Sequence, residues 1–449
     1  MIERLGDASK DSPWKLPRTV LGSEEELLHE RFQGAVPEKL FREIEIPLSR
    51  VLSGMQERGI LLDIEHLKKL SEEYHSKLKK LEKKIWVMAG EEFNINSPKQ
   101  VGEILFDKLG LRVKRQKKTK NGSYSTNISE LIKLKNEHPI INEIISYREF
   151  AKLVSTYIDA LPKLVDENNR LHTTFDQAGT ATGRISSKDP NLQNIPKRTE
   201  LGRNIRRAFI AGKGFKLAAF DYSQIELRVA AILSKDSKMS EIFKKGEDIH
   251  SAVASKVFNV TPDKITAEMR RRAKVINFGI IYGMGINALK ANLGCSREEA
   301  MIFYKEYFKN FNGMAEYVEH IKEFARKNGY TETLFGRKRF FPEINSPIEY
   351  VRKETERMAV NAPIQGTAAD FIKLAMVRAD KALGDKKLKS KARLLLQIHD
   401  ELLFEIDEKI IGQCIPLIIR EMEEVYKNDV PIKVNVAVGK NWEDMILYK

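Results

Sequence analysis

The spacing of apolar residues divides the chain into helical and strand-like segments. Between Pro47 and Trp86, apolar residues recur every three or four positions among many charges, which predicts long helices packed on one side. Residues 215–233, FKLAAFDYSQIELRVAAIL, open as a short apolar strand and continue with helical spacing. Residues 236–345 have a mostly helical pattern and are rich in Lys, Arg and aromatic side chains.

The last sixty residues contain strand patterns. Residues 391–407, KARLLLQIHDELLFEID, consist of two apolar runs separated by the polar letters HDE, which predicts a β-hairpin. The ending PIKVNVAVGKNW alternates between polar and apolar residues like another strand. We therefore expect a mixed α+β fold, in which a small sheet is built from segments far apart in sequence and two mainly helical lobes are attached to it.

Two segments at the front of the chain are polar. Residues 1–45 are interrupted by Pro13, Pro17 and Pro37, and we interpret them as a leader or the remnant of a preceding domain. The lysine run KRQKKTKNG at 114–122 ends in Asn-Gly, a turn signal, and predicts a basic loop at the tip of the first helical region. Composition alone favours a solvated loop, whereas the short polar side chains around it would also suit phosphate contacts.

The composition narrows the function classes. Lys plus Arg number 77 against 63 Asp plus Glu in 449 residues, a net charge of +14. This excess favours a polyanionic partner, although a basic protein of another function would fit the charge equally well. With only Cys295 and Cys414, a disulfide framework or a Cys-based zinc site is not expected. The sequence has neither a signal peptide nor an apolar run of membrane-spanning length, which predicts a cytoplasmic protein with no membrane partner.

Two acidic residues stand where strands end. Asp221 directly follows an apolar strand, and Asp400 lies at the tip of the predicted hairpin. Converging carboxylates repel each other unless a cation lies between them, and Mg²⁺ prefers such oxygen ligands. Two Mg²⁺ ions, which Mn²⁺ could replace, would assist phosphoryl transfer, with the backbone carbonyl of Tyr222 as a further ligand and Glu401 in a supporting role. Taken singly, each acid is more often a turn or cap residue.

The segment 268–285, EMRRRAKVINFGIIYGMG, carries a second group of candidate residues. Arg270, Lys274, Phe278 and Tyr282 are spaced four residues apart, so they form one slanted stripe on a helix. The stripe would be about 18 Å long at 1.5 Å per residue, a length that suits an extended nucleotide. Cations at one end would bind phosphates, and aromatic rings at the other would contact sugar and base.

The same spacing has a simpler interpretation, namely an amphipathic helix with its charges exposed and its aromatic rings buried. The spacing alone favours that interpretation. Gly279 and Gly283 within the segment lower helix stability, which is easier to explain if a base pair must approach the backbone closely.

Three segments resemble motifs A, B and C of family A (DNA polymerase I-type) DNA polymerases. They are DYSQIELR (221–228), RRRAKVINFGIIYG (270–283) and QIHDELLFE (397–405), in the family's order and with similar spacing. Four further segments fit the same family: TATGRISSKDPNLQNIP (180–196), DIHSAVASKVF (248–258), TLFGRKR (333–339) and ERMAVNAPIQGTAADFIK (356–373). The similarity extends from about Pro47 to the C-terminus, with Ile232 where the family commonly has His.

The resemblance implies a right-hand polymerase fold with an antiparallel-sheet palm, helical fingers and a helical thumb. The thumb would span residues 46–165, the palm 166–230 and 356–449, and the fingers 231–355. The resemblance also implies a monomeric DNA-directed DNA polymerase that acts in replication or repair. Such an enzyme would extend a primer on a DNA template with dNTPs by a two-metal mechanism and release pyrophosphate. Residues 1–45 contain no Asp-x-Glu pair that ends a strand, so we expect no 3′–5′ proofreading in this chain.

The resemblance also assigns roles to single residues. Asp221 and Asp400 would be the metal ligands, and Lys274 would donate a proton to pyrophosphate. The residues expected to bind the incoming nucleotide are Arg270, Lys274, Phe278, Tyr282, His250, Gln224 and Glu226. The residues expected along the primer–template, mostly in the minor groove, are Arg184, Arg357, Asn361, Gln365 and His399.

Two other functions have to be weighed against this one. A single-subunit RNA polymerase would share the palm, but Glu226 at the sugar edge would crowd a 2′-hydroxyl. A non-catalytic nucleic-acid clamp would have lost its chemistry, whereas Asp221, Asp400 and Lys274 are all present. A primer-extension assay with dNTPs or rNTPs distinguishes the three functions.

Overall fold

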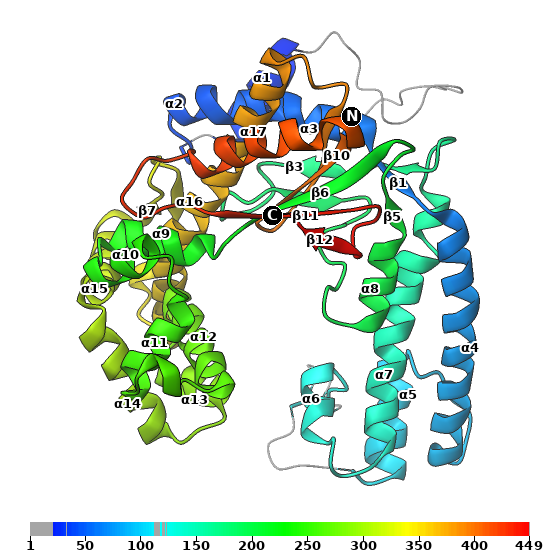
Figure 1. Ribbon diagram of the computed structural model, residues 1–449. Coiled ribbons are helices and arrows are strands. Elements are labelled where there is room, and N and C mark those ends of the chain that lie inside the picture. Colours follow the sequence, from blue (N-terminus) through cyan, green and yellow to red (C-terminus); the bar gives the residue numbers. More distant parts are fainter. Residues whose placement is uncertain (1–20, 33, 112–116, 119–121, 123, 449) are drawn as a thin grey trace, which may run out of the picture.

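In the computed structural model, two helical lobes extend from the same side of a central body that contains the main sheet (Figure 1). The structure describes residues 21–448 except 33, 112–116, 119–121 and 123. Most of the lysine run at 114–122, which we expected to be a basic loop, therefore lies outside the described residues. Among the residues that are described, no helix is long and apolar enough to cross a membrane.

The main sheet has five antiparallel strands in the order β12-β11-β6-β10-β9. Their bounds are β6 Phe215–Tyr222, β9 Ala392–Ile398, β10 Glu401–Asp407, β11 Val434–Gly439 and β12 Met445–Leu447. The central position of β6 follows from its sequence, since its run from Leu217 to Phe220 is buried throughout. The predicted hairpin is confirmed, but its turn is shorter than HDE because Glu401 already pairs with Asp221 across the sheet.

Three helices cover one face of this sheet (Figure 1). Helix α17 (Ile411–Glu423) packs against β10 and β11, and α3 (Ile46–Arg58) packs against β9. The 37-residue helix α16 (Glu349–Asp385) contacts both of them. Small residues such as Ala362, Ala368 and Ala375 let neighbouring elements approach α16 closely and are buried.

The first lobe is built on two long antiparallel helices, α4 (Ile64–Ala89) and α7 (Ile140–Leu153). It has a small apolar core of its own around Val101, Leu105 and Ile144. Its remaining described elements are α5 Pro98–Gly102, a π-helix Glu103–Lys108, α6 Ile128–Lys133, a π-helix Val154–Ile158 and a 3₁₀ turn Leu161–Lys163. This lobe is where the resemblance places the thumb.

A short strand interrupts the helical pattern predicted for residues 47–86. The strand β1 (Ile60–Leu62) pairs with β2 (Arg170–Leu171) and β5 (Phe209–Ile210). The sequence ILLD fits a helix and a strand equally well, so periodicity did not predict the break. Gly59 makes the break, because its φ of 58° is a left-handed conformation that glycine adopts at no steric cost.

The second lobe is helical, as predicted. Its described helices are α9 Ile225–Ser234, α10 Ser237–Lys244, α11 Ile249–Phe258, a 3₁₀ turn Pro262–Lys264, α12 Ala267–Ile281, α13 Ile286–Leu293, α14 Arg297–Asn310 and α15 Asn312–Asn328. The hairpin of β7 (Tyr330–Glu332) and β8 (Lys338–Phe340), followed by the 3₁₀ turn Pro342–Asn345, leads into α16. Elsewhere, β3 (Thr174–Asp176) pairs with β4 (Ser186–Lys188), and α8 (Glu200–Arg207) precedes β5.

The N-terminal segment, expected to be a polar leader or a domain remnant, is folded onto the body where it is described. It consists of α1 (Leu21–Phe32), α2 (Glu38–Leu40) and a π-helix (Phe41–Glu45). Four of its apolar residues, Phe32, Leu40, Phe41 and Ile44, are buried, whereas Leu27 is exposed. The abundance of polar residues hid these anchors in the sequence, and the assignment of residues 1–45 to a separate unit stays a prediction.

Candidate active site

Asp221 and Asp400, here called the acidic pair, meet at one end of β6. The backbone N–H of Tyr222 donates to the carbonyl of Asp400 at 3.1 Å, and the left-handed φ of 56° at His399 allows the tight turn that carries Asp400. Burial raises the pKa of Asp221 to about 7, with a further contribution from the charge of Asp400 and a hydrogen bond between the two side chains. Burial also raises the pKa of Asp400. The convergence predicted from the sequence is therefore present.

Glu401 is the cross-strand neighbour of Asp221, and other groups hold its carboxylate. It is buried, and its Oε1 accepts a hydrogen bond of 2.8 Å from Trp442 Nε1. Its Oε2 accepts one of 2.9 Å from Lys197 Nζ. Both contacts keep the carboxylate in the body of the sheet, which fits a supporting role. Neither Lys197 nor Trp442 was predicted from the sequence. The signal available there was Trp442 itself, which stands in the polar stretch between β11 and β12.

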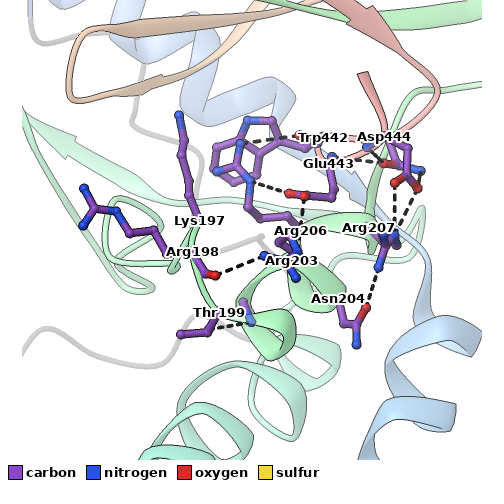
Figure 2. A network of polar contacts seen from close by, with 12 residues as sticks. Lys197, Arg198, Thr199, Arg203, Asn204, Arg206, Arg207, Trp442, Glu443 and Asp444 are labelled. Carbon is purple, nitrogen blue, oxygen red and sulfur yellow. Dashed lines mark hydrogen bonds and ion pairs between the residues drawn. The ribbon is translucent and has the colours of Figure 1, made fainter. Parts of the chain in front are cut away.

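A network of polar contacts surrounds this tryptophan (Figure 2). The guanidinium of Arg206, on α8, lies 3.7 Å from the centre of the Trp442 ring, and its Nε is 3.5 Å from Glu443. Arg207 pairs with Asp444 at 3.1 Å. Cation–π and ionic contacts of this kind fix the tryptophan, and thereby the position of Glu401.

The donor set at the acidic pair suits a divalent cation. Within the described part of the chain, no three His, Cys, Asp or Glu side chains are grouped to hold a metal ion, so the candidate ligands are two carboxylates and a backbone carbonyl. Tyr222 supplies that carbonyl at the strand end while its hydroxyl donates to Met422 at 2.9 Å. Two half-buried acids with raised pKa values are the arrangement that a hard cation stabilises.

Helix α12 presents the predicted stripe on one face. Thr266 caps the helix by accepting from the N–H of Met269 at 3.1 Å. Arg270, Lys274 and Tyr282 are exposed and Phe278 is half-buried, so the alternative of a buried aromatic face does not hold. The rings of Phe278 and Tyr282 stack with an interplanar angle of 25° and centroids 6.1 Å apart. The stripe therefore has a cationic end and an aromatic end, both accessible.

Arg270 has a partner that the sequence did not predict. Its Nε and Nη2 donate to the two oxygens of Asp248 at 3.0 and 2.8 Å, and Asp248 also caps α11 through the N–H of Ser251. Burial alone would raise the pKa of Asp248, but the hydrogen bonds from Arg270 and Ser251 lower it to about 2. The guanidinium is thus already aligned by an anion.

His250 lies behind the stripe. Its ring is 3% exposed, contacts the Asn277 amide at 3.0 Å through Nδ1 and lies 5.8 Å from the ring of Phe278. Burial lowers the pKa of His250 to about 4, so the ring is neutral at neutral pH. The structure therefore does not bring His250 onto the open face where a triphosphate would first bind.

Glu226, on α9, is held by two side chains. The hydroxyl of Tyr282 donates to its Oε2 at 2.7 Å, and Arg184 Nη2 donates to its Oε1 at 2.5 Å. Of these two partners, Arg184 was expected along the primer–template. Glu226 does not pair with Arg228, which instead donates to the carbonyls of Ser223 and Pro431.

One cavity of about 200 Å³ joins these groups. Its lining includes Glu226, Phe278, Tyr282, His399 and Asp400. This cavity is therefore lined by parts of all three groups: Asp400 of the acidic pair, the aromatic end of the stripe and the Glu226 carboxylate. Gln224, in a left-handed conformation with φ of 54° before α9, lines it as well.

The other residues expected along DNA lie on one helix and in one turn. Arg357, Asn361 and Gln365 are spaced four apart on α16, with Arg357 exposed and the other two half-buried. The Oδ1 atom of Asn361 is buried without a hydrogen-bond partner, which is rare unless a ligand or water completes the site. His399 is exposed beside the acidic pair.

The structure shows a packing role for the two glycines in the stripe segment. Gly283 has φ of 65°, and a Cβ on it would lie 2.8 Å from the Cα of Arg357. A Cβ on Gly279 would lie 3.2 Å from the sulfur of Met284. Close packing of the end of α12 on its own neighbours favours glycine at both positions, and the approach of a base pair stays a prediction.

The chain is similar to known proteins over most of its length. Residues 64–444 match the family model of DNA polymerase family A. The thermostable DNA polymerase I of Thermus filiformis is 47% identical over 432 residues, which are 94% of this chain and 51% of that protein. DNA polymerase I of Bacillus subtilis is 48% identical over 408 residues, 90% of this chain and 46% of that protein. The chain thus spans about half the length of these relatives.

A solved structure gives the same picture. The POL domain of Pol1 from M. smegmatis, in complex with DNA primer-template and dNTP, superposes with a TM-score of 0.84. It is 42% identical to this chain, and the match covers 90% of this chain and 71% of that one.

Proposed function

The chain belongs to DNA polymerase family A and has the right-hand fold of such a domain, and on this premise we propose that it extends the 3′ end of a primer on a DNA template. It would consume dNTPs and release pyrophosphate. The observation that carries the proposal is the shared cavity, into which Asp400 and the aromatic end of the stripe, Phe278 and Tyr282, all open. A nucleotide bound along the stripe would have its reacting phosphate near the acidic pair.

The acidic pair and the carbonyl of Tyr222 would hold the divalent cations. Their fit rests on the donor set, because half-buried carboxylates with raised pKa values are stabilised by added positive charge. Two Mg²⁺ ions, or Mn²⁺ in their place, would favour deprotonation of the attacking hydroxyl and balance the charge of the leaving pyrophosphate. Glu401, held by Trp442 and Lys197, would keep the edge of the sheet in position.

The stripe on α12 would hold the triphosphate and the sugar. Because Asp248 occupies Nε and Nη2 of Arg270, a phosphate would bind the remaining N–H groups of this guanidinium or displace Asp248. Lys274 is an exposed ammonium one turn further along. As the primer 3′-oxygen bonds to the α-phosphorus, the bond to the bridging oxygen of pyrophosphate breaks, and Lys274 Nζ would give that leaving group a proton. Phe278 and Tyr282 would pack against sugar and base.

The primer–template would lie along α16 and the turn of the β9–β10 hairpin. Arg357, Asn361, Gln365 and His399 present donors and acceptors there, and the unpaired Asn361 Oδ1 would gain a partner. Minor-groove acceptors are nearly the same for all base pairs, so such contacts would check duplex shape without reading sequence. Arg184 would reach the primer end only by exchanging or sharing its bond to Glu226.

Selection of dNTPs would depend on Glu226. Its carboxylate is already bonded to Tyr282 and Arg184, so a ribose 2′-hydroxyl would meet an occupied acceptor in a confined space. This supports a DNA polymerase over a single-subunit RNA polymerase. A non-catalytic clamp would have no need of the acidic pair.

Primer extension tests the proposal. A labelled primer on templates of different sequence should be extended with Mg²⁺ and dNTPs, with products that follow the template, and much less with rNTPs. EDTA should stop the reaction. Extension only with rNTPs would indicate an RNA polymerase instead. DNA binding without extension would indicate a non-catalytic clamp.

We also propose that this chain does not proofread. The reason is that every motif on which the proposed function rests serves synthesis. The 449-residue polypeptide should leave a mismatched primer end intact. Loss of labelled nucleotides from such a primer, incubated without dNTPs in a nuclease-free preparation, would contradict this part.

A further inference from the structure

Four charged side chains form a buried cluster outside the site described above: Glu45, Arg337, Asp370 and Lys373. Their exposed fractions are between 0 and 6%. Glu45 Oε1 accepts hydrogen bonds from Lys373 Nζ, at 2.8 Å, and from Arg337 Nη2. Arg337 Nε also donates to Asp370 at 2.8 Å, and Gln177 Nε2 donates to the other oxygen of Glu45 at 2.6 Å. Every member is therefore paired at least once.

The buried cluster is balanced, with two positive and two negative groups. Burial lowers the pKa of Lys373 to about 8, although Glu45 opposes this. Burial works to raise the pKa of Glu45, yet the charges of Lys373 and Arg337 outweigh it and lower that pKa. Removing one partner of such a group leaves a buried charge without compensation. Glu45 is therefore the hydrogen-bonded counter-charge of Lys373 and shares Arg337 with Asp370.

The members of the cluster come from three distant parts of the chain. Glu45 ends the N-terminal segment, Arg337 lies in the turn between β7 and β8, and the other two lie on α16. The N-terminal segment touches the same turn again, since the carbonyl of Ala35 accepts from the N–H of Lys338 at 2.7 Å. The cluster is thus the point at which this segment is fixed to the body.

Arg337 connects the cluster to Arg184. A Cβ placed on Gly183 would lie 2.8 Å from Arg337 Cδ, and Gly183 has φ of 78°. The stem of Arg337 therefore packs directly against the turn that carries Arg184, the residue bonded to Glu226 at 2.5 Å. Lys373 holds the start of the same loop by donating to the carbonyl of Gln177 at 3.0 Å.

The cluster also lies immediately behind the site. Lys373 and its neighbours Ala369 and Ile372 line a small cavity together with Arg184 and His399. Ala369, Ile372, Arg184 and His399 line the larger cavity of the acidic pair as well. A shift of Lys373 or Arg337 would therefore move the wall of the nucleotide site.

We propose that Glu45 is a positioning residue for sugar selection. Through Arg337 and Lys373 it fixes the loop of residues 177–184, and so holds Arg184 against Glu226. This inference rests on the proposed polymerase function and adds that a residue of the N-terminal segment controls how strictly ribonucleotides are excluded.

The test uses the full chain, with E45Q, K373M and the double variant E45Q/K373M. E45Q leaves the cluster with one excess positive charge. The double variant also removes the charge of Lys373, so Arg337 and Asp370 remain as a neutral pair. The readout is the ratio of kcat/KM for dCTP and CTP. We expect this ratio to fall about fivefold or more in E45Q, as coupling between contacting residues allows, and to return to within about twofold of wild type in the double variant.

A matched control comes from the same segment. Arg31 pairs with Asp176 on the surface at 2.8 Å, so R31A loosens the segment without changing the cluster and should leave the ratio unchanged. Should E45Q fail to fold, E45D, which keeps the charge but shortens the side chain, replaces it with a smaller expected fall.

The outcomes separate the two proposals. No extension by wild type would overturn the proposed function itself. Glu45 would be only structural if wild type extends the primer and E45Q or E45D has a lower melting temperature and kcat but the same ratio of kcat/KM for dCTP and CTP. A lowered ratio that the double variant does not restore would also overturn the inference.

Discussion

The hydroxyl of Tyr282 donates a hydrogen bond of 2.7 Å to Glu226. This contact links the end of α12 in the second lobe to α9, next to the end of β6 that carries the acidic pair. Burial, and then the charge of Glu226, raise the pKa of Tyr282, so the tyrosine remains a hydrogen-bond donor at neutral pH. The two residues close one side of the cavity in which we expect the sugar of the incoming nucleotide.

Glu226→Ala should admit ribonucleotides. A ribose would no longer press its 2′-hydroxyl against a carboxylate that is bonded elsewhere, and discrimination built on such contacts is large. We expect the ratio of kcat/KM for dCTP and CTP to fall at least about tenfold, with a smaller loss for dCTP alone. Glu241→Ala, which removes an exposed acid of the same lobe, is the control. An unchanged ratio in Glu226→Ala would place the sugar gate elsewhere.

Phe278→Tyr should favour incorporation of dideoxynucleotides relative to deoxynucleotides. The half-buried ring is the aromatic side chain nearest to the cationic end of the stripe, so an added hydroxyl could replace the missing sugar 3′-hydroxyl near the phosphates. Competition between ddNTPs and dNTPs in a termination ladder measures this. The same termination pattern in wild type and variant would count against placing Phe278 at the sugar.

Gly283→Ala should destabilise the fold. The residue has φ of 65°, and an added Cβ would lie 2.8 Å from the backbone of Arg357, so strain and overlap act together. We expect a loss of about 1–3 kcal/mol in unfolding free energy, measured by denaturant titration. Gly285→Ala is the matched control, because nothing lies within 4 Å of a Cβ there. Equal effects of the two substitutions would contradict the packing argument.

Acidification should weaken the fold partly through His250. Burial lowers its pKa from the ordinary value of 6.5 to about 4, so the unfolded chain binds a proton in this pH range before the folded one does. Unfolding free energy is therefore lost as the pH falls from about 6.5 towards 4. In His250→Gln this part of the loss should disappear, so the gap in stability between wild type and variant should narrow from pH 7.5 to 5.5. A constant gap would mean that His250 titrates normally in the folded chain.

The sequence predicted the elements whose patterns are local. The apolar run 217–220 predicted the central strand, and the two runs around HDE predicted the hairpin that brings Asp400 to Asp221. The four-residue spacing predicted the stripe on α12, because helix geometry fixes which side chains share a face. In these cases the signal lies within a few neighbouring residues.

The contacts that depend on distant segments were not predictable in this way. Nothing near Arg270 in the sequence indicates that Asp248, 22 residues earlier, binds its guanidinium. Glu45 and Lys373 are 328 residues apart, and their surroundings look like ordinary helical surface until the chain is folded. The same holds for Glu401, whose partner Trp442 comes from beyond the next strand.

The acidic pair is the centre of the account, and the most direct measurement compares catalysis with DNA binding in Asp221→Asn and Asp400→Asn. Each variant keeps the shape of the side chain and removes its charge, while affinity for DNA comes mainly from phosphate contacts elsewhere. Asp407→Asn, at the far end of β10, is the control and should behave as wild type. We predict that the rate of single-turnover extension with Mg²⁺ falls at least about a thousandfold in both variants, whereas the Kd for primer–template stays within a few-fold of wild type. Extension at near wild-type rate by either variant would contradict the assignment of the acidic pair as metal ligands.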